Sequence, residues 1–284
     1  LDRESLNIHD LNSKNQKASY FSTEKSNMRA LCLFFICAVN AFTATAQAEE
    51  ARAAVASNFL GTFRMLTSDF ANKTPHQILI ISGSSGKLYA QIQHGAPFDL
   101  FFSADQHRPE LLEKEGQAIK GSRFPYALGR LTLWSPKPNF IPADGKTALT
   151  REDITHLAIA NPKTAPYGRA AEQTLRALGL WDQLTPRLVY GENIAQTFQF
   201  VSSHNAELGF VARSQVVSSH NQESGSHWDV PPTLHDPIVQ EAVLLHQGGT
   251  NTAARAFLEY ITSPSAQAII HQQGYGIPVP EKAP

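Results

Sequence analysis

Four short turns of this sequence carry hydroxyl, amide and small side chains where a helix is expected to begin. They are Ser57-Asn58, Ser82–Lys87, Tyr167-Gly168 and Asn193-Ile194, each between an apolar run and residues at helical spacing. The first amides of a helix lack an intrahelical acceptor and carry the positive end of its dipole, so such a turn can hold an anion without a basic side chain. The turns predict binding of a small anion; the alternative is that all four are simply capped helices.

The segment Ser82–Lys87 has some likeness to a phosphate-binding loop, but its spacing does not fit one. Walker spacing would put a glycine where Ile81 stands, and Lys87 is followed by leucine rather than Ser or Thr. No G-x-S-x-G passes through Ser84 or Ser85, so the nucleophile elbow of a hydrolase is missing as well. A secreted α/β hydrolase that pairs one of these serines with a histidine stays the alternative from another functional class.

Histidines and cysteines give little support to a metal site. The histidines are spread along the chain without H-x-x-x-H spacing, and His220 and His227 fall in a Ser-, His-, Gly- and Pro-rich stretch, 218–237, that reads as a loop. Both cysteines, Cys32 and Cys37, precede Ala48, so the rest of the chain has neither thiolate ligands nor disulfides. We expect no cation ligands and no cofactor.

Composition and charge narrow the class of protein further. The chain of 284 residues is 42% hydrophobic and 17% charged, which is typical of a globular protein and excludes a disordered or collagen-like chain. With 24 basic and 25 acidic residues it has no basic excess for a nucleic-acid partner. Because five of the basic and four of the acidic residues precede Glu49, the remainder is slightly acidic, and only local dipoles could hold an anion.

The N-terminal region has the organisation of a secretory signal. Arg29 precedes an apolar run at 30–39, and the small-residue exit Ala-Gln-Ala ends at Ala48. The signal peptide is therefore predicted at 28–48, with export to the periplasm, and 1–27 is interpreted as upstream sequence that is not part of the mature protein. A membrane anchor or a lipoprotein is the alternative, although the apolar run is short for a span.

The remaining chain alternates apolar runs with helical patterns. The runs at 53–56, 77–81 and 98–102 each lead through a turn into helical spacing, which predicts parallel strands covered by helices. Further strands are predicted at 131–134, 157–160, 188–189, 208–211 and 239–245, and further helices at 169–178, 194–201, 253–261 and 265–272.

This pattern predicts an α/β fold with two lobes. The first lobe takes 49–130 and the second 131–237, and 238–284 returns to the first, with crossings near Gly129 and Ile238. Two crossings make a hinge, and the ligand site is expected in the cleft between the lobes.

Six segments, in chain order, resemble the periplasmic molybdate-binding proteins of bacterial ABC importers. The resemblance implies a type II two-lobed periplasmic solute-binding fold with a two-strand hinge, a tetrahedral oxyanion between the lobes, and delivery to a membrane permease. The segments are 54–59 (AVASNF), 82–92 (SGSSGKLYAQI), 95–105 (GAPFDLFFSAD), 161–168 (NPKTAPYG), 191–193 (GEN) and 274–278 (GYGIP).

The resemblance also implies which residues hold the oxyanion. Matched position by position, the ligand loops fall on Ser57 and Asn58, on Ser85, on Tyr167, and on Ile194 through its backbone amide. By this resemblance, the same residues would bind the metal only as part of its oxyanion, and no residue would coordinate a metal cation directly.

The sequence departs from one branch of this family in a late strand. That branch has a tyrosine after Gly-x-Val, whereas here Gly209–Val211 is followed by Ala212, so that hydroxyl is missing. This leaves open whether Tyr167 binds through its amide, its hydroxyl or both. Glu192, beside the fourth loop, is the one acidic residue close to a proposed contact position.

The resulting prediction is a monomeric, non-enzymatic receptor for molybdate and tungstate. Ions that are fully ionised near neutrality need only donors, whereas protonated phosphate gains from a carboxylate acceptor, which the proposed contact positions lack. A receptor for sulfate or another tetrahedral oxyanion is the alternative within this class. A ligand-sensing module of a signalling protein is an alternative from another class.

Overall fold

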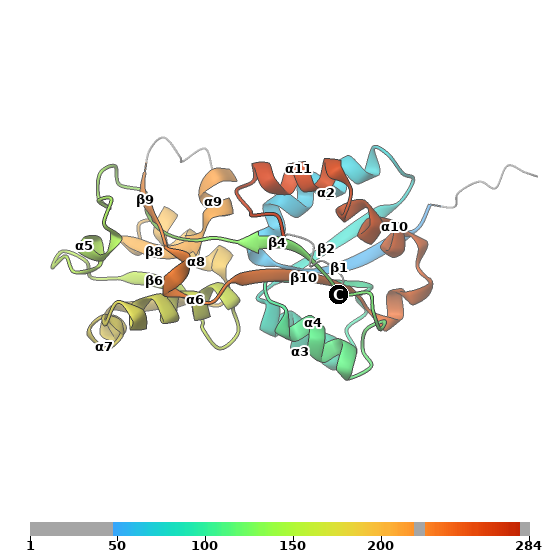
Figure 1. Cartoon of the computed structure of the whole chain (residues 1–284), viewed down its shortest axis with the longest axis horizontal. Coiled ribbons are helices and arrows are strands. Elements are labelled where there is room, and N and C mark those ends of the chain that lie inside the picture. Colours follow the sequence, from blue (N-terminus) through green and yellow to red (C-terminus); the bar gives the residue numbers. More distant parts are fainter. Residues whose placement is uncertain (1–47, 219–224, 279–284) are drawn as a thin grey trace, which may run out of the picture. The chain divides into compact units, whose positions relative to one another are not determined.

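The computed structural model describes residues 48–218 and 225–278, which form two α/β lobes, each on a five-stranded sheet (Figure 1). The predicted signal peptide, apart from Ala48, and the segment 1–27 lie outside the described residues. In the described part of the chain, no helix combines the length and apolar character needed to cross a membrane.

The sheet of lobe 1 has the strand order β2-β1-β3-β10-β4. β1 runs parallel to β2 and β3, as the three strand-turn-helix units predicted, and β10 runs antiparallel to β3 and β4. The strands are β1 (Glu50–Ala56), β2 (Gln77–Gly83), β3 (Leu100–Ser103), β4 (Phe124–Gly129) and β10 (Ile238–Leu244).

Alternate residues of β1 pack into two cores on opposite faces of this sheet. Val55 belongs to the core under α2 (Leu60–Ala71), α10 (Thr252–Ile261) and α11 (Pro264–Gln272), and its neighbour Ala54 to the core under α3 (Ser85–Gln93) and α4 (His107–Lys114). Successive side chains of a strand point to opposite faces, and a parallel sheet covered by helices on both sides needs apolar residues on both. This explains the short, continuous apolar run of β1.

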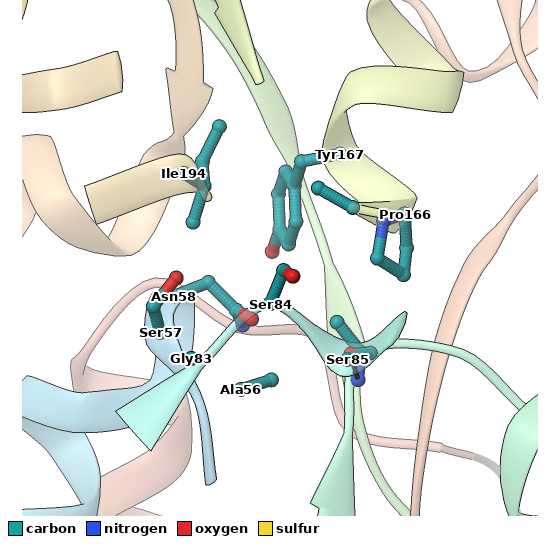
Figure 2. A pocket seen from close by; sticks show the side chains of 11 residues that line it. Ala56, Ser57, Asn58, Gly83, Ser84, Ser85, Pro166, Tyr167 and Ile194 are labelled. Carbon is teal, nitrogen blue, oxygen red and sulfur yellow. Dashed lines mark hydrogen bonds between the residues drawn. The ribbon is translucent and has the colours of Figure 1, made fainter. Parts of the chain in front are cut away.

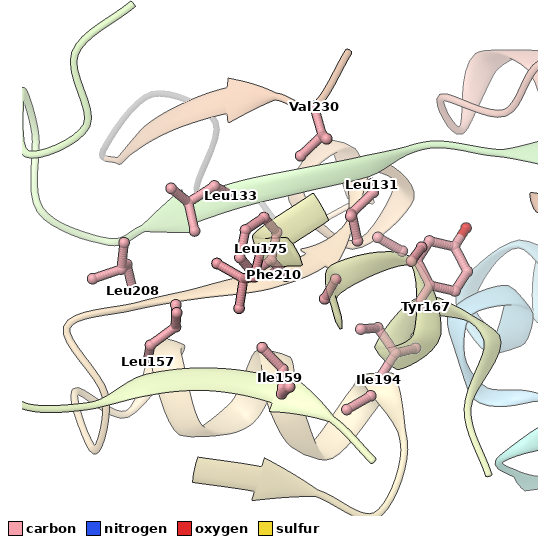
Figure 3. Packing of buried hydrophobic residues seen from close by; sticks show 14 of the residues in the cluster. Leu131, Leu133, Leu157, Ile159, Tyr167, Leu175, Ile194, Leu208, Phe210 and Val230 are labelled. Atoms are coloured by element: carbon pink, nitrogen blue, oxygen red, sulfur yellow. The ribbon is translucent and has the colours of Figure 1, made fainter. Parts of the chain in front are cut away.

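The sheet of lobe 2 has the order β7-β6-β8-β5-β9. Leu133, Ile159 and Phe210 fill the core between this sheet and the helix α6 (Pro166–Ala177) (Figure 3). The elements of lobe 2 are β5 (Leu131–Ser135), β6 (Leu157–Ala160), β7 (Leu188–Gly191), β8 (Leu208–Ala212), β9 (Ser226–Asp229), α5 (Gly145–Leu149), α6 (Pro166–Ala177), α7 (Trp181–Leu184), α8 (Ile194–Ser202) and α9 (Arg213–Ser218).

The described chain passes between the two sheets at two places. Arg130 alone separates the end of β4 from the start of β5, and the return runs from Asp229 at the end of β9 to Ile238 at the start of β10. Ile238 pairs with Gly129, so the two connections lie side by side. Such a pair of adjacent connections is the structural basis for a hinge.

Three sequence predictions about elements need correction. The stretch 218–237 is not all loop, because β9 pairs there with β5; its alternately exposed residues left no apolar run to detect. No strand was predicted at β4. The helix predicted from Arg169 begins at Pro166, since proline fits the first turn of a helix, where its missing N–H is not needed.

Candidate functional site

The four predicted turns meet in one pocket between the lobes (Figure 2). From lobe 1 come the start of the 3-10 turn Ser57–Phe59 that leads into α2 and the start of α3; from lobe 2 come the starts of α6 and α8. The pocket is lined by Ala56, Ser57, Asn58, Gly83, Ser84, Ser85, Ala104, Ala165, Pro166, Tyr167 and Ile194. All five sequence-predicted site residues are therefore brought together.

Ser57 and Asn58 do not act as the helix caps that their residue types suggested. The cap position of their turn is Ala56, with no side-chain hydrogen bond. The amide of Asn58 donates instead to Gln240 Oε1 at 2.9 Å and to the Tyr275 hydroxyl at 3.2 Å. Because this amide bonds to side chains behind the pocket, its orientation is fixed by tertiary contacts that the local sequence does not contain.

Ser84 and Ser85 divide two tasks at the start of α3. Ser84 is the N-cap, and its Oγ accepts from the Lys87 amide at 3.4 Å. The Oγ of Ser85 accepts the backbone N–H of Ala104 at 2.9 Å. With its lone pair engaged by a donor, the Ser85 hydroxyl can turn its own proton toward a ligand. Ser84 lines the pocket too and was not among the predicted contacts.

On the lobe 2 side, Tyr167 lies in the first turn of α6 and Ile194 is the first residue of α8. Asn193 caps α8 as predicted, since its Oδ1 accepts from the Ala195 and Gln196 amides. The side chain of Tyr167 is 2% exposed, and its hydroxyl accepts from Gln240 Nε2 at 3.2 Å. Ala212, where one branch of the resembled family has tyrosine, does not line the pocket.

The pocket is electrically neutral in its side chains. None of its lining residues is acidic, basic or a histidine, so the positive ends of the converging helices set the local potential. The pocket also lacks a general base for a serine nucleophile, which argues against the hydrolase alternative. In the described part of the chain there is no cluster of His, Cys, Asp or Glu that could hold a metal ion; His220 lies outside this part, and His227 is exposed in β9.

The phenol of Tyr167 stays neutral. Burial raises the pKa of Tyr167 well above its ordinary value and the Tyr275 hydroxyl raises it further, while hydrogen bonds from Gln240 and the Arg130 backbone lower it by less. A neutral phenol can donate a hydrogen bond to an anion, whereas a phenolate would repel it.

The lobes touch each other directly beside the pocket. The N–H of Gly86 donates to the Thr164 carbonyl at 2.9 Å, which joins α3 to the loop before α6. Next to this contact Lys87 forms an ion pair with Glu192, and both side chains are about half exposed. Glu192, which could have placed a negative charge against the ligand, is thus paired and is not a lining residue.

One residue behind the pocket was missed by sequence reasoning. Gln240 is fully buried in β10 and contacts Asn58, Tyr126 and Tyr167. Its signal in the sequence is an amide inside the otherwise largely apolar run of β10, since a buried polar side chain needs hydrogen-bond partners. The sequence does not reveal which partners those are.

Comparisons with known proteins agree with this architecture. The family model for bacterial extracellular solute-binding proteins matches residues 51–276. The chain is 48% identical over 232 residues to the molybdate-binding protein ModA of Azotobacter vinelandii, covering 82% of this chain and 92% of that protein. It is 45% identical to the molybdate-binding protein ModA of Rhodobacter capsulatus, covering 81% of this chain and 89% of that protein.

A solved structure supports the same relationship. The periplasmic molybdate-binding protein of Azotobacter vinelandii superposes with a TM-score of 0.78 at 43% sequence identity, covering 81% of this chain and 100% of that one. The extent of these matches and the shared two-lobed architecture show that the chain belongs to the family of bacterial extracellular solute-binding proteins, and within it to the molybdate-binding proteins.

Proposed function

We propose that this protein binds molybdate and tungstate in the pocket between its lobes and delivers them to the membrane permease of an ABC importer. The observation that carries the proposal is the convergence of four helix N-termini on an uncharged, buried pocket. The similarity to two molybdate-binding proteins supports molybdate as the ligand. Sulfate is the alternative ion, and no feature of the pocket favours it.

The contacts we propose are the hydroxyls of Ser57, Ser85 and Tyr167 and backbone amides of Asn58 and Ile194. A hydrogen bond to a charged group contributes roughly 1.5 to 3 kcal/mol net. About five of them, less the free-energy cost of immobilising the ligand and the lobes, are enough for a Kd on the order of micromolar to nanomolar. Because every partner is a donor, the pocket suits an ion that is fully deprotonated near neutral pH.

A thermal-shift panel with molybdate, tungstate, sulfate and phosphate tests this proposal. A ligand at about 100 times its Kd stabilises the folded state by about 2.7 kcal/mol, which raises the Tm by roughly 5 to 10 °C for a chain of this size. We expect such a shift with molybdate and tungstate. A Tm that no molybdate concentration changes would overturn the assignment.

A matched pair of serine variants locates the site. Ser57→Ala removes a hydroxyl from the pocket wall, whereas Ser68→Ala removes one from an exposed position in α2. We expect the first to reduce the molybdate-induced shift and the second to leave it unchanged. Equal shifts in both variants would place the ligand elsewhere.

The proposal extends to the protein's place in the cell. We propose cleavage after Ala48 and action in the periplasm as a monomer without a cofactor, an enzymatic activity or a nucleic-acid partner. The N-terminal sequence of the exported protein, its mass in solution, and molybdate-dependent stimulation of ATP hydrolysis by the permease in vesicles test these points. An exported form that keeps residues 28–48 would contradict the cleavage site.

A further inference from the structure

Four side chains, two that line the pocket and two behind it, form a hydrogen-bonded chain with a fixed direction. The chain, which we call the donor relay, consists of Tyr275, Asn58, Gln240 and Tyr167, and each member is at most 5% exposed. It begins in lobe 1, passes through β10 and ends at the lobe 2 residue Tyr167, which lines the pocket. Its direction decides what the last hydroxyl can do.

The direction of the relay is set by the backbone carbonyl of Asn58, which can only accept a hydrogen bond. The Tyr275 hydroxyl donates to the backbone carbonyl of Asn58 at 2.7 Å, so the oxygen of Tyr275 is left to accept. It accepts from Ser214 Oγ at 2.9 Å and from Asn58 Nδ2 at 3.2 Å, so the amide of Asn58 presents its nitrogen here. A backbone carbonyl has no alternative role, and the orientation of Asn58 therefore follows from it.

The same logic fixes Gln240. The second proton of Asn58 Nδ2 goes to Gln240 Oε1 at 2.9 Å, and the Tyr126 hydroxyl lies at the same distance from that oxygen. With Oε1 receiving a donor, the other end of the amide is Nε2, which donates to the Tyr167 oxygen at 3.2 Å. Gln240 therefore presents a donor, not an acceptor, to Tyr167.

Tyr167 is consequently surrounded by donors. Besides Gln240, the Arg130 backbone lowers its pKa through a hydrogen bond, while burial and Tyr275 raise it. Tyr126 and Tyr275 each have a carbonyl to donate to, but in the described part of the chain the Tyr167 hydroxyl bonds only as an acceptor. Its own proton is left for the pocket, and Figure 2 shows this hydroxyl directed toward Ser84.

We propose that Gln240 is a specificity-determining positioning residue, which acts through Tyr167 to make its hydroxyl an obligatory donor and so rejects oxyanions that carry a proton. Hydrogen phosphate would bring an O–H to an oxygen whose lone pairs are already engaged, whereas an unprotonated oxyanion accepts there. Gln240 is absent from the pocket lining, and its effect passes through the relay. This inference rests on the proposed function and deepens it.

A double-mutant cycle with Gln240→Met and Tyr167→Phe tests the inference. Methionine is close to glutamine in size but cannot donate to Tyr167, so the phenol regains a free lone pair. By titration calorimetry with molybdate, and with phosphate in competition, we expect Gln240→Met to lower the molybdate-to-phosphate affinity ratio at least tenfold and molybdate affinity at least fivefold. In the Tyr167→Phe background the same change should alter molybdate affinity less than twofold.

The control is Gln267→Met in α11, a partly buried glutamine outside the pocket whose Nε2 donates to the Ile261 carbonyl at 2.9 Å. It should lower the Tm and leave the affinity ratio unchanged. A purely structural role for Gln240 would weaken both anions alike and in both Tyr167 backgrounds, which would overturn the inference.

If Gln240→Met does not fold, Gln240→Glu provides a second readout of the same size. Its carboxylate would accept the Tyr167 proton and weaken molybdate binding, and because burial raises the pKa of a carboxyl, lowering the pH should restore binding by protonating it. Tyr126 and Tyr167, which bond to this position, stay neutral throughout, since burial raises the pKa of both. A loss of affinity that does not change between about pH 5 and 8 would contradict the relay.

The two levels of the proposal fail separately. A wild-type protein that molybdate does not stabilise would overturn the proposed function. A wild-type protein that binds molybdate, together with a Gln240→Met variant of unchanged selectivity and affinity, would overturn the role of Gln240 alone.

Discussion

Gly86 is the position at which closure of the lobes can be tested most directly. It is the second residue of α3, and its N–H donates across the lobes to the Thr164 carbonyl. A Cβ built on Gly86 would lie 2.9 Å from that carbonyl oxygen, 3.0 Å from the Thr164 Cα and 2.9 Å from Nη2 of Arg108. Two of these neighbours are backbone atoms, and the third belongs to a buried arginine paired with Asp105, so none can easily move.

Gly86→Ala should therefore weaken ligand binding without weakening the unliganded fold. Overpacking of a close contact costs about 1 to 3 kcal/mol. If the lobes separate when no ligand is bound, this penalty falls on the closed form alone and lowers molybdate affinity roughly 5- to 150-fold. In the open form the same substitution has the opposite effect, because alanine in place of a helical glycine raises stability by up to about 0.5 to 1 kcal/mol.

The matched control is Gly61→Ala. Gly61 is also the second residue of its helix, α2, but nothing lies closer than 4.0 Å to a Cβ at that position. Titration calorimetry, denaturant unfolding without ligand, and small-angle scattering with and without molybdate should show weaker binding and less compaction for Gly86→Ala only. Binding within twofold of the wild type would refute the reasoning that closure needs this contact.

Three further outcomes are expected. Ser85→Ala should lower molybdate affinity at least tenfold, as measured by titration calorimetry. It should also lower the free energy of unfolding, measured in urea, by about 1 to 3 kcal/mol, because the buried N–H of Ala104 loses its acceptor. Glu192→Gln breaks the exposed ion pair with Lys87 and should change molybdate affinity by less than about fivefold, and this effect should vanish in about 0.5 M salt. A larger effect would mean that the ion pair is strongly coupled to closure of the lobes. Burial raises the pKa of Tyr167 above its ordinary value, so the stability that the neutral phenol contributes is complete below about pH 10 and is lost as the pH rises through the folded-state pKa. Molybdate affinity should likewise be constant from about pH 6 to 9 and fall only above about pH 10. A decline in affinity near neutral pH would point to another titrating group.

The local signals in the sequence predicted the α/β class and most strands and helices. Short apolar runs identified β1 and β6 because strands covered on both faces consist of apolar residues. The sequence pattern did not predict β9, whose alternate residues are exposed, and α6 begins earlier than the pattern indicated. β9 is an edge strand, and the first turn of α6 contains Pro166 and Gly168, which are weak helix formers.

The residues of the candidate site were also predicted from the sequence only in part. Residue types and the family resemblance predicted Ser57, Asn58, Ser85, Tyr167 and Ile194, and the structure places them in one pocket. The alternative that all four turns are simply capped helices does not describe every turn, because the turn at Ser57 has no side-chain cap. Ser84 caps α3, while Ser85 and Asn58 bond to groups distant in sequence.

The sequence by itself determined the four turns, their helix-initiating character and the absence of charge at the contact positions, since each depends on a few neighbouring residues. Only the tertiary structure decided that these turns converge, that Gly86 meets Thr164, and that Gln240 turns a donor toward Tyr167. The partners of Gln240 lie 73 to 182 residues away along the chain. The direction of a buried hydrogen bond depends on every donor and acceptor around it, and the fold alone brings those groups together.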